Sequence, residues 1–156
     1  MADVGAIHVL TTPGGTITFN NGTLHSLDDL YWIQEIDGLD GAPRRSPVDS
    51  KPLAHGGLVH DIWKGPRPFT IEGVILIQSA PFGDACRSAR NTMESNLVVA
   101  LDSILDGDGT WVWTPIGLGA RSLTVRNPEK IDFKHQDDYA LLGFTFGLIA
   151  AEPDWA

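Results

Sequence analysis

The clearest alternation of apolar and polar residues in this chain runs over Phe69–Ser79. An extended strand places alternate residues on opposite faces, so this stretch predicts a strand with one apolar face. Val74 and Leu76 make the far half of the second face apolar as well, which is typical of a central strand covered on both sides. Pro66 and Pro68 precede it. Because proline is poorly tolerated inside a sheet, the strand is predicted to begin at about Phe69.

Eight other stretches show short apolar alternation bounded by glycine, proline or asparagine turn signals. Asn21–Gly22 predicts a tight type I′ hairpin turn, because both central positions of that turn need positive φ. The further predicted strands are Val4–Thr12, Thr16–Phe19, Leu30–Asp37, Leu58–Trp63, Thr110–Thr114, Arg121–Arg126, Ile131–His135 and Tyr139–Ala150.

Apolar residues recur at three- and four-residue steps from Cys86 to Leu105, which predicts one amphipathic helix over about residues 84–106. Asp84 is the predicted N-cap, since its side chain can accept a hydrogen bond from a free backbone N–H. Gly107 is the predicted end, because glycine suits the left-handed position after the last turn.

These elements predict a mainly β (α+β) fold, a two-sheet β-sandwich of about eight to nine strands flanked by one α-helix. The 156 residues fit a single domain, residues 1–156, and no internal repeat divides them. Residues 38–57 are rich in glycine and proline and form an unusually long connection. Two interpretations stay open for this loop: a solvated loop, or an arm that reaches onto a neighbouring subunit.

Charge and composition narrow the functional classes. Twenty acidic and eleven basic residues give a net charge of −9, and the basic residues form no dense cluster, which disfavours binding to a nucleic-acid backbone. Cys86 is the only cysteine, so no internal disulfide can form. No apolar run is long enough to span a bilayer, and the N-terminus lacks a basic secretory start, so we expect synthesis in the cytoplasm and no membrane association.

Metal-binding patterns are incomplete. Asp106 and Asp108 are spaced as in part of a calcium loop, but the twelfth position is Gly117 rather than a glutamate. His55 and His60 are five residues apart, which puts them on opposite faces of a strand. No metal site and no cofactor is predicted.

Catalytic patterns are equally weak. Glu35, Asp37 and Glu72 could supply paired carboxylates for glycoside hydrolysis, but no spacing selects a pair. No nucleophile elbow is present, and Cys86 fits a buried helix position better than a nucleophile. A carboxylate hydrolase therefore stays a minor hypothesis, and we expect no enzymatic activity.

The tryptophan residues allow a second interpretation of the function of this protein. Trp32 and Trp111 are predicted to fill the core. Exposed tryptophans stack on sugar rings in carbohydrate-binding modules, and Trp63 and Trp155 are the candidates for such a role.

The order of features resembles a known family. The strand LYWIQEIDGLDG precedes a polar loop, His55–Gly56, and a basic residue, Arg67, before an alternating strand in GPRPFTIEGVI. A helix, a strand ending in Trp113–Thr114–Pro115 and a closing FTFGLIAAEPDW follow. Over about residues 16–155 this is similar to the N-terminal, ring-forming domain of the distal tail proteins of long-tailed (siphovirus-type) bacteriophages.

The resemblance implies a β-sandwich flanked by a helix, six copies of which form a ring at the tail tip. Such a hexameric ring connects the tail tube protein to the tape-measure, tail-tip hub and host-recognition proteins, lets DNA pass through its lumen, and belongs to the virion after assembly in the host cytoplasm. Many relatives carry a second, carbohydrate-binding-like domain beyond the region that ends here at Ala156, so the hub role is expected more than direct receptor binding. A tail tube subunit is the alternative within this class, and a carbohydrate-binding β-sandwich module is the alternative outside it.

A ring of this kind needs head-to-tail contacts between different surfaces of neighbouring subunits. On this interpretation Arg44 and Arg45 pair with an acidic neighbour and set register more than affinity. The residues predicted to contact a neighbouring subunit are Arg44, Arg45, His55, Trp63 and Arg67.

Overall fold

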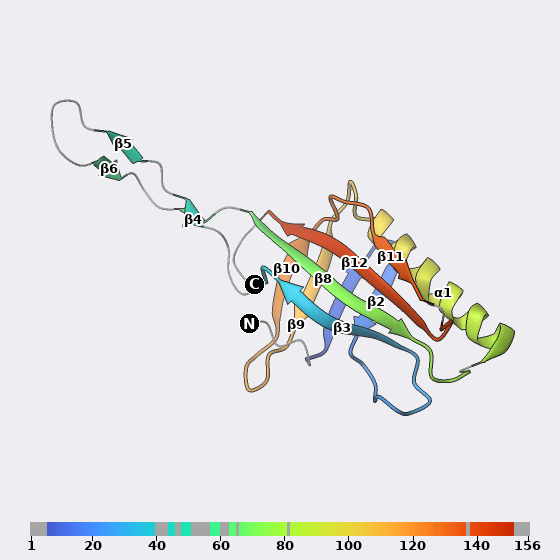
Figure 1. Ribbon diagram of the computed structural model, residues 1–156. Coiled ribbons are helices and arrows are strands. Elements are labelled where there is room, and N and C mark those ends of the chain that lie inside the picture. The colour runs from blue at the N-terminus through green and yellow to red at the C-terminus, as the bar shows by residue number, and fades with distance from the viewer. Residues whose placement is uncertain are drawn as a thin grey trace.

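A computed structural model describes most of the chain (Figure 1). The described residues are 6–39, 44–45, 48–50, 57–59, 63–64, 66–80, 82–136 and 138–151.

The described part of the chain contains twelve strands and one helix. In order they are β1 (His8–Thr12), β2 (Gly15–Phe19), β3 (Leu30–Asp37), β4 (Arg44–Arg45), β5 (Val48–Ser50), β6 (Gly57–Val59), β7 (Trp63–Lys64), β8 (Arg67–Leu76), α1 (Gly83–Asp102), β9 (Gly109–Trp113), β10 (Arg121–Val125), β11 (Asp132–His135) and β12 (Leu141–Ala150).

The eight longest strands form one sheet in the order β10-β9-β1-β2-β3-β8-β12-β11. Neighbours run antiparallel except β2 and β3, which are joined in parallel through the single pair Phe19 and Tyr31. The sheet returns on itself where Arg126, just after β10, and Ile149 of β12 exchange two backbone hydrogen bonds of 2.9 Å. It therefore curls nearly into a barrel (Figure 1).

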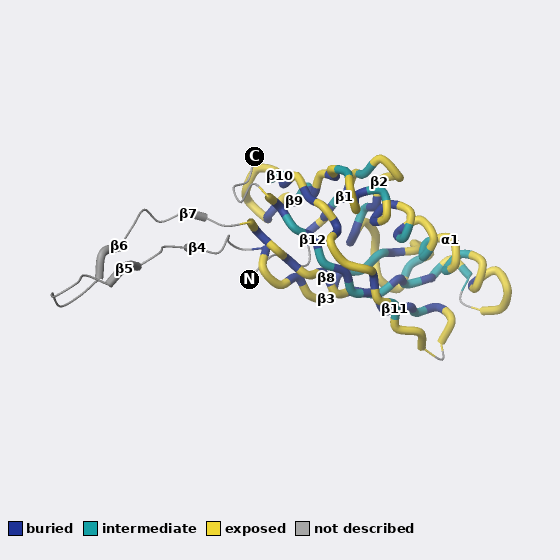
Figure 2. Tube along the Cα trace, turned by 90° about the horizontal axis from the view of Figure 1, so that it is seen from above, coloured by how far each residue is buried: buried dark blue, intermediate teal, exposed yellow. Residues whose placement is uncertain are grey.

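One core fills the curl. Leu10 and Trp111 from one half of the sheet belong to the same buried cluster as Ile71 and Phe144 from the other half. Helix α1 packs against β2, with further contacts to β8 and β1, and closes the core from outside. The helical residues buried there are Cys86, Leu97, Ala100 and Leu101. Figure 2 shows buried and exposed positions alternating along the strands.

The predicted mainly β fold with one flanking helix is confirmed. The two layers of the predicted sandwich are halves of one continuous curled sheet, because β2 and β3 stay linked at Phe19 and Tyr31.

Strand β8 begins two residues earlier than predicted, at Arg67, and Pro68 lies inside it opposite Ile149. The backbone of Ile149 bonds to Arg126 on its other side, so strand alternation makes the Pro68 position a non-hydrogen-bonded pair with β12. On its β3 side, Pro68 lies beyond Asp37, the last paired residue. The missing N–H is therefore needed by neither neighbour.

The predicted hairpin at Asn21–Gly22 is wrong, because β2 and β3 run parallel. The chain instead leaves β2 through Asn20, whose φ is +60°. The buried Asn20 amide donates to the Ala6 carbonyl (3.0 Å) and accepts from the Ile33 N–H (2.8 Å), tying the start of the chain to β3. A side chain that satisfies backbone groups on both sides replaces the expected tight turn.

The long loop is also not structureless. Strand β4 pairs with β7, and β5 pairs with β6, in two short antiparallel ladders separate from the main sheet. These four strands are called the arm below. Of the predicted strand Leu58–Trp63, residues 58 and 59 lie in β6 and Trp63 lies in β7, whereas residues 60–62 lie outside the described residues. Figure 1 draws β4, β5 and β6 away from the eight-stranded sheet.

Helix α1 ends at Asp102, earlier than predicted, and its N-cap is Phe82 rather than Asp84. After the helix, the Ile104 N–H donates to the Leu101 carbonyl (3.1 Å) and the Ile104 carbonyl accepts from the Asn127 N–H (3.1 Å). This tight turn buries Ile104 and leaves Leu105 about half exposed. The apolar spacing in the sequence therefore continues beyond the last residue of the helix.

Candidate functional site

The arm brings together three of the five residues predicted to contact a neighbour. Arg44 pairs with Lys64 and Arg45 pairs with Trp63 across the β4–β7 ladder. Three basic residues and an aromatic residue thus share two adjacent rungs, and the sequence analysis had not singled out Lys64. His55 lies outside the described residues.

Arg67 lies at the root of the arm, inside this chain. Its side chain is 4% exposed, and Nη1 donates to the Leu39 carbonyl at 3.4 Å. Leu39 is the last described residue before the arm, so Arg67 joins the points where the chain leaves the sheet and returns to it. A buried guanidinium needs such acceptors to offset its lost hydration. Its predicted contact with a neighbour stays a prediction.

Gly38 fixes the same root. Its φ is +90°, and an added Cβ would meet the Pro68 carbonyl oxygen. Only glycine combines this backbone conformation with this close approach at low cost. The direction in which the arm leaves the sheet is therefore set by residues of the sheet.

The outward face of β3, β8, β12 and β11 carries a row of acidic residues, with Lys134 of β11 as a basic residue on the same face. Glu35 of β3 is the register partner of Glu72 of β8, Glu72 faces Thr145 of β12, and Thr145 faces Asp132 of β11. The three carboxylate side chains are exposed. Like charges directly across a ladder cost stability, so this row is not there to stabilise the monomer.

The next row continues the acidic face. Asp37 pairs with Thr70, and Thr70 pairs with Gly147. The Glu129 carboxylate lies 3.9 Å from where a Cβ on Gly147 would stand. The acidic face is defined as Glu35, Asp37, Glu72, Glu129 and Asp132.

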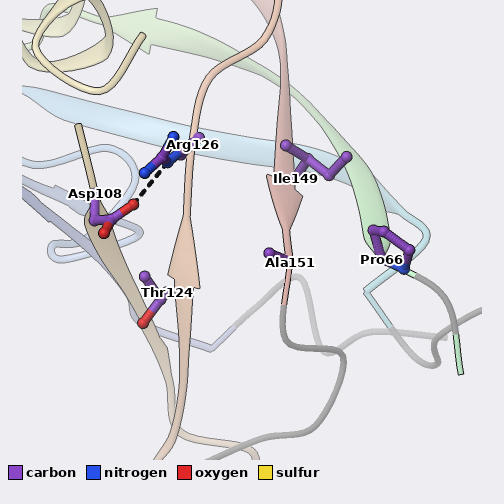
Figure 3. A pocket seen from close by; sticks show the side chains of 6 residues that line it. All are labelled: Pro66, Asp108, Thr124, Arg126, Ile149 and Ala151. Carbon is purple, nitrogen blue, oxygen red and sulfur yellow. Dashed lines mark hydrogen bonds and ion pairs between the residues drawn. The ribbon is translucent and has the colours of Figure 1, made fainter. Parts of the chain in front are cut away.

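A cavity of about 400 Å³ lies between β10 and the end of β12 (Figure 3). Asp108, Thr124 and Arg126 line one side, and Ile149, Ala151 and Pro66 line the other. Arg126 Nε is 2.7 Å from Asp108 Oδ1. Both side chains are more than half exposed, so this ion pair contributes little to stability.

Loop 20–29 is held against the chain after β8. The backbone N–H groups of Gln78 and Ser79 and the Ser79 hydroxyl donate to the Asp29 carboxylate. Burial opposes the charge, but these three hydrogen bonds prevail and lower the pKa of Asp29. The Gln78 amide donates to the carbonyls of Thr23 and Asp28 (3.0 and 2.6 Å), so the loop is fixed at several points.

The tryptophans divide between core and surface. Trp111 is fully buried, as predicted, and Trp113 is 6% exposed. His8 stacks on Trp113, with 5.8 Å between ring centroids. Trp32 is only half buried and lies on β3. The side chain of Trp63 and all of Trp155 lie outside the described structure, so the carbohydrate-binding hypothesis stays a prediction.

Tyr31 ties β3 to the helix. Its hydroxyl donates to the Met93 carbonyl at 2.7 Å, and burial raises the pKa of Tyr31 to about 12. This contact belongs to the packing of the helix rather than to a reactive site.

In the described part of the chain, no three histidine, cysteine or carboxylate side chains come together in a way that could hold a metal ion. Among the same residues, no helix has both the length and the hydrophobicity needed to cross a membrane.

No protein-family model matches the sequence, and no curated protein matches it. Known structures with a similar fold include the crystal structure of the SPP1 Dit (gp 19.1) protein, described as a paradigm of the hub adsorption apparatus in phages infecting Gram-positive hosts. It superposes with a TM-score of 0.59 at 15% sequence identity, covering 94% of this chain and 50% of that one. This chain therefore spans about half the length of that protein.

A subunit from the tail of an empty GTA particle, refined with C6 symmetry, covers 100% of this chain and 97% of its own at 12% identity. Its TM-score of 0.44 is too low to support an inference. The resemblance to distal tail proteins is thus confirmed at the level of the fold, through the SPP1 protein.

Proposed function

We propose that this chain is a structural protein of a phage tail that forms a ring of six copies at the tail tip. The ring connects the tail tube to tail-tip and host-recognition proteins, and the chain carries out no catalysis. The observation that carries the proposal is the fold shared with the SPP1 Dit protein over 94% of this chain.

The arm supports the ring. A heterologous ring needs each subunit to offer a projecting element and a different receiving surface. Strands β4–β7 are bonded only to one another among the described strands, and Gly38 and Arg67 fix their root to the sheet. An element anchored at its base but unpartnered along its length suits contact with a neighbouring subunit.

The acidic face supports a role for the sheet as the wall of a channel. A lumen that conducts DNA must not hold phosphate groups, and exposed carboxylates repel them. Glu35, Glu72 and Asp132 form one continuous row across four strands. Repeated around a ring, this row gives the lumen a band of negative charge.

The direct test is the mass of the assembled protein. Light scattering should give a mass near six times the monomer mass of 16.9 kDa, and negative-stain electron microscopy should show rings. A chain that stays monomeric across micromolar concentrations, alone and with its tail tube protein, would contradict the proposal.

A separate experiment tests whether the acidic face lines the channel of the ring. Changing Glu35 and Glu72 to lysine should leave rings intact but make them retain DNA, measured by filter binding at increasing salt. Rings of a variant with Asp84→Lys and Asp102→Lys, two exposed acids on α1, serve as the matched control. Equal DNA retention by both variants would remove the acidic face from the channel wall.

A further inference from the structure

We propose that the cavity between β10 and the end of β12 receives the arm of a second copy of this chain as an added β-strand. The inference rests on the proposed ring and names the surface that the arm contacts. The cavity is the one lined by Asp108, Thr124, Arg126, Ile149, Ala151 and Pro66.

The backbone of β10 is arranged to accept a strand. Arg126 directs both its N–H and its C=O toward β12, where they bond to Ile149. Backbone groups alternate sides along a strand, so Thr124 and Ser122 direct theirs the same way, away from β9. Among the described residues, neither Thr124 nor Ser122 has a backbone partner on that side. An open strand edge of this kind is a template for strand addition.

Among the described residues, the chain after β10 pairs with β12 only at Arg126 and Ile149. Past the Arg126–Ile149 bridge, Ala151 lies across the cavity from Thr124, and Pro66 lies beside it (Figure 3). Ile149, Ala151 and Pro66 offer apolar contact on this side of the cavity. The gap is therefore a notch in the sheet with a hydrogen-bonding edge on one side and an apolar wall on the other.

The arm has the matching charge. Residues 41–65, the segment that contains the arm, hold four of the chain's eleven basic residues and two of its twenty acidic residues, so the rest of the chain holds the other eighteen acidic residues and only seven basic ones. The notch itself is lined by Asp108, with Arg126 as the cation paired to it, and the rest of the chain around it is acidic. A basic strand is favoured there over an acidic one.

The sequence around β4 suits a short edge strand. Pro43 and Pro47 bracket Arg44, Arg45 and Ser46, so only these three residues between the prolines have a backbone N–H. Proline confines a strand to edge positions and to few rungs, which matches a notch that offers only Thr124 and Ser122.

The location of the notch allows the contact to repeat. Pro66 lines the notch and lies immediately before β8, at the root of the chain's own arm. A subunit that receives an arm there sends its own arm onward from the same end. Each copy therefore donates and receives once, which is the pattern of a closed heterologous ring.

Disulfide cross-linking between two single variants tests the inference. Thr124→Cys, carrying a mass tag, is mixed with Arg45→Cys, and the native Cys86 is buried and does not interfere. Thr92→Cys on the exposed face of α1, with the same tag, is the matched control for Thr124→Cys. Sulfurs held at a docked strand meet at a high effective concentration, so we expect about tenfold more mixed dimer than with the control pair.

The same samples are measured by light scattering, which separates the two proposals. Assembled protein with no excess of the mixed dimer would overturn the notch inference and leave the ring standing. Absence of any assembled species would overturn both, because the occupant is a second copy.

A charge change gives an independent readout. Asp108→Lys should weaken assembly several-fold more than Asp106→Lys, since Asp106 is exposed but does not line the cavity. Far-UV circular dichroism should be unchanged in both variants. Equal assembly constants for the two variants would contradict the assignment.

Discussion

The two faces of β8 differ in their side chains: the inward face is apolar and buried, and the outward face carries exposed charge. On the inward face, Phe69, Ile71 and Ile75 are at most 2% exposed. On the outward face, Glu72 is exposed and lies opposite Glu35, an arrangement that costs stability. The inward face thus holds the fold together, whereas the outward face carries like charges that do not stabilise the monomer.

The contrast ends where loop 20–29 covers the outward face. Leu30 and Leu76 are register partners there, and Leu30 is only 2% exposed. An added Cβ on Gly22 would meet the Leu30 side chain, so the loop packs directly on this residue. The apolar second face near the end of β8 is explained by this loop.

Ile71→Asp should have the largest effect. It places an unpaired carboxylate in a fully buried position, which costs several kcal/mol and is comparable to the total stability of a domain. We expect loss of the cooperative thermal transition followed by circular dichroism. Thr70→Asp, one residue away on the outward face, should stay folded. Equal loss in both variants would break the contrast between the two faces.

Gly73→Ala should come next. Its Cβ would meet the Trp32 carbonyl oxygen and lie 2.8 Å from the Phe144 ring. Overpacking of this kind costs about 1–3 kcal/mol, measured by urea denaturation. Gly143→Ala is the matched control, because its nearest contact is the Lys134 Cβ at 3.2 Å on the outward side. A greater loss of stability for Gly143→Ala than for Gly73→Ala would mean that the tight packing lies on the outward face rather than the inward face.

Asp29→Asn should destabilise the protein by roughly 1 kcal/mol at neutral pH, a modest value because the carboxylate is exposed to solvent. The pKa of Asp29 is lowered below its usual value of 3.8 in the folded state. The unfolded chain therefore binds the proton first as pH falls, so the contribution is complete above about pH 4 and is lost through the folded pKa.

The measurement is the difference in unfolding free energy between wild type and Asp29→Asn as a function of pH. This difference should shrink toward low pH, where the Asp29 carboxylate of the wild type becomes protonated. A pH-independent difference would mean that the loop is held by packing rather than by the carboxylate.

Glu72→Gln should stabilise the monomer by a few tenths of a kcal/mol, because it removes a like-charge pair with Glu35. Glu35→Gln should do the same, and the double variant should gain little more. The gain should diminish at high salt, which screens exposed charges. Destabilisation by either change would show that the acidic row helps to hold the sheet.

Arg44→Glu with Arg45→Glu should have the smallest effect on folding. The arm is bonded to no strand of the main sheet among those described, so the unfolding free energy should change by less than about 0.5 kcal/mol. Assembly, followed by light scattering, should be clearly weakened. A folding defect as large as that of Ile71→Asp would make the arm part of the core.

Local patterns predicted much of the fold. Leu30–Asp37 is a strand with the bounds that its alternation indicated, and Trp111 is buried as its apolar strand implied. Local patterns failed where the conformation depends on a contact with residues farther away in the sequence. Asn21–Gly22 suits a tight turn, but Asn20 is held by Ala6 and Ile33, which a local signal cannot reveal.

The site shows the same division. The basic pair Arg44–Arg45 and the unusual length of its loop are visible in the sequence, which is why an inter-subunit arm was one of the two interpretations of this loop. Glu35 and Glu72 were visible only as unrelated carboxylates, because their pairing depends on the register between β3 and β8 and on a bulge after Ile33. The notch between β10 and β12 left no signal at all, since it depends on how far the sheet curls.

By itself, the sequence of this protein determined the strands of the main sheet, the helix and the side of β8 that is buried, because alternation and charge are properties of neighbouring residues. The tertiary structure alone decided that the strands form one curled sheet, that acids of three strands fall into one row, and that Thr124 has no strand partner on its β12 side among the described residues. Those features depend on register and curvature, which are set by contacts between residues far apart in the chain.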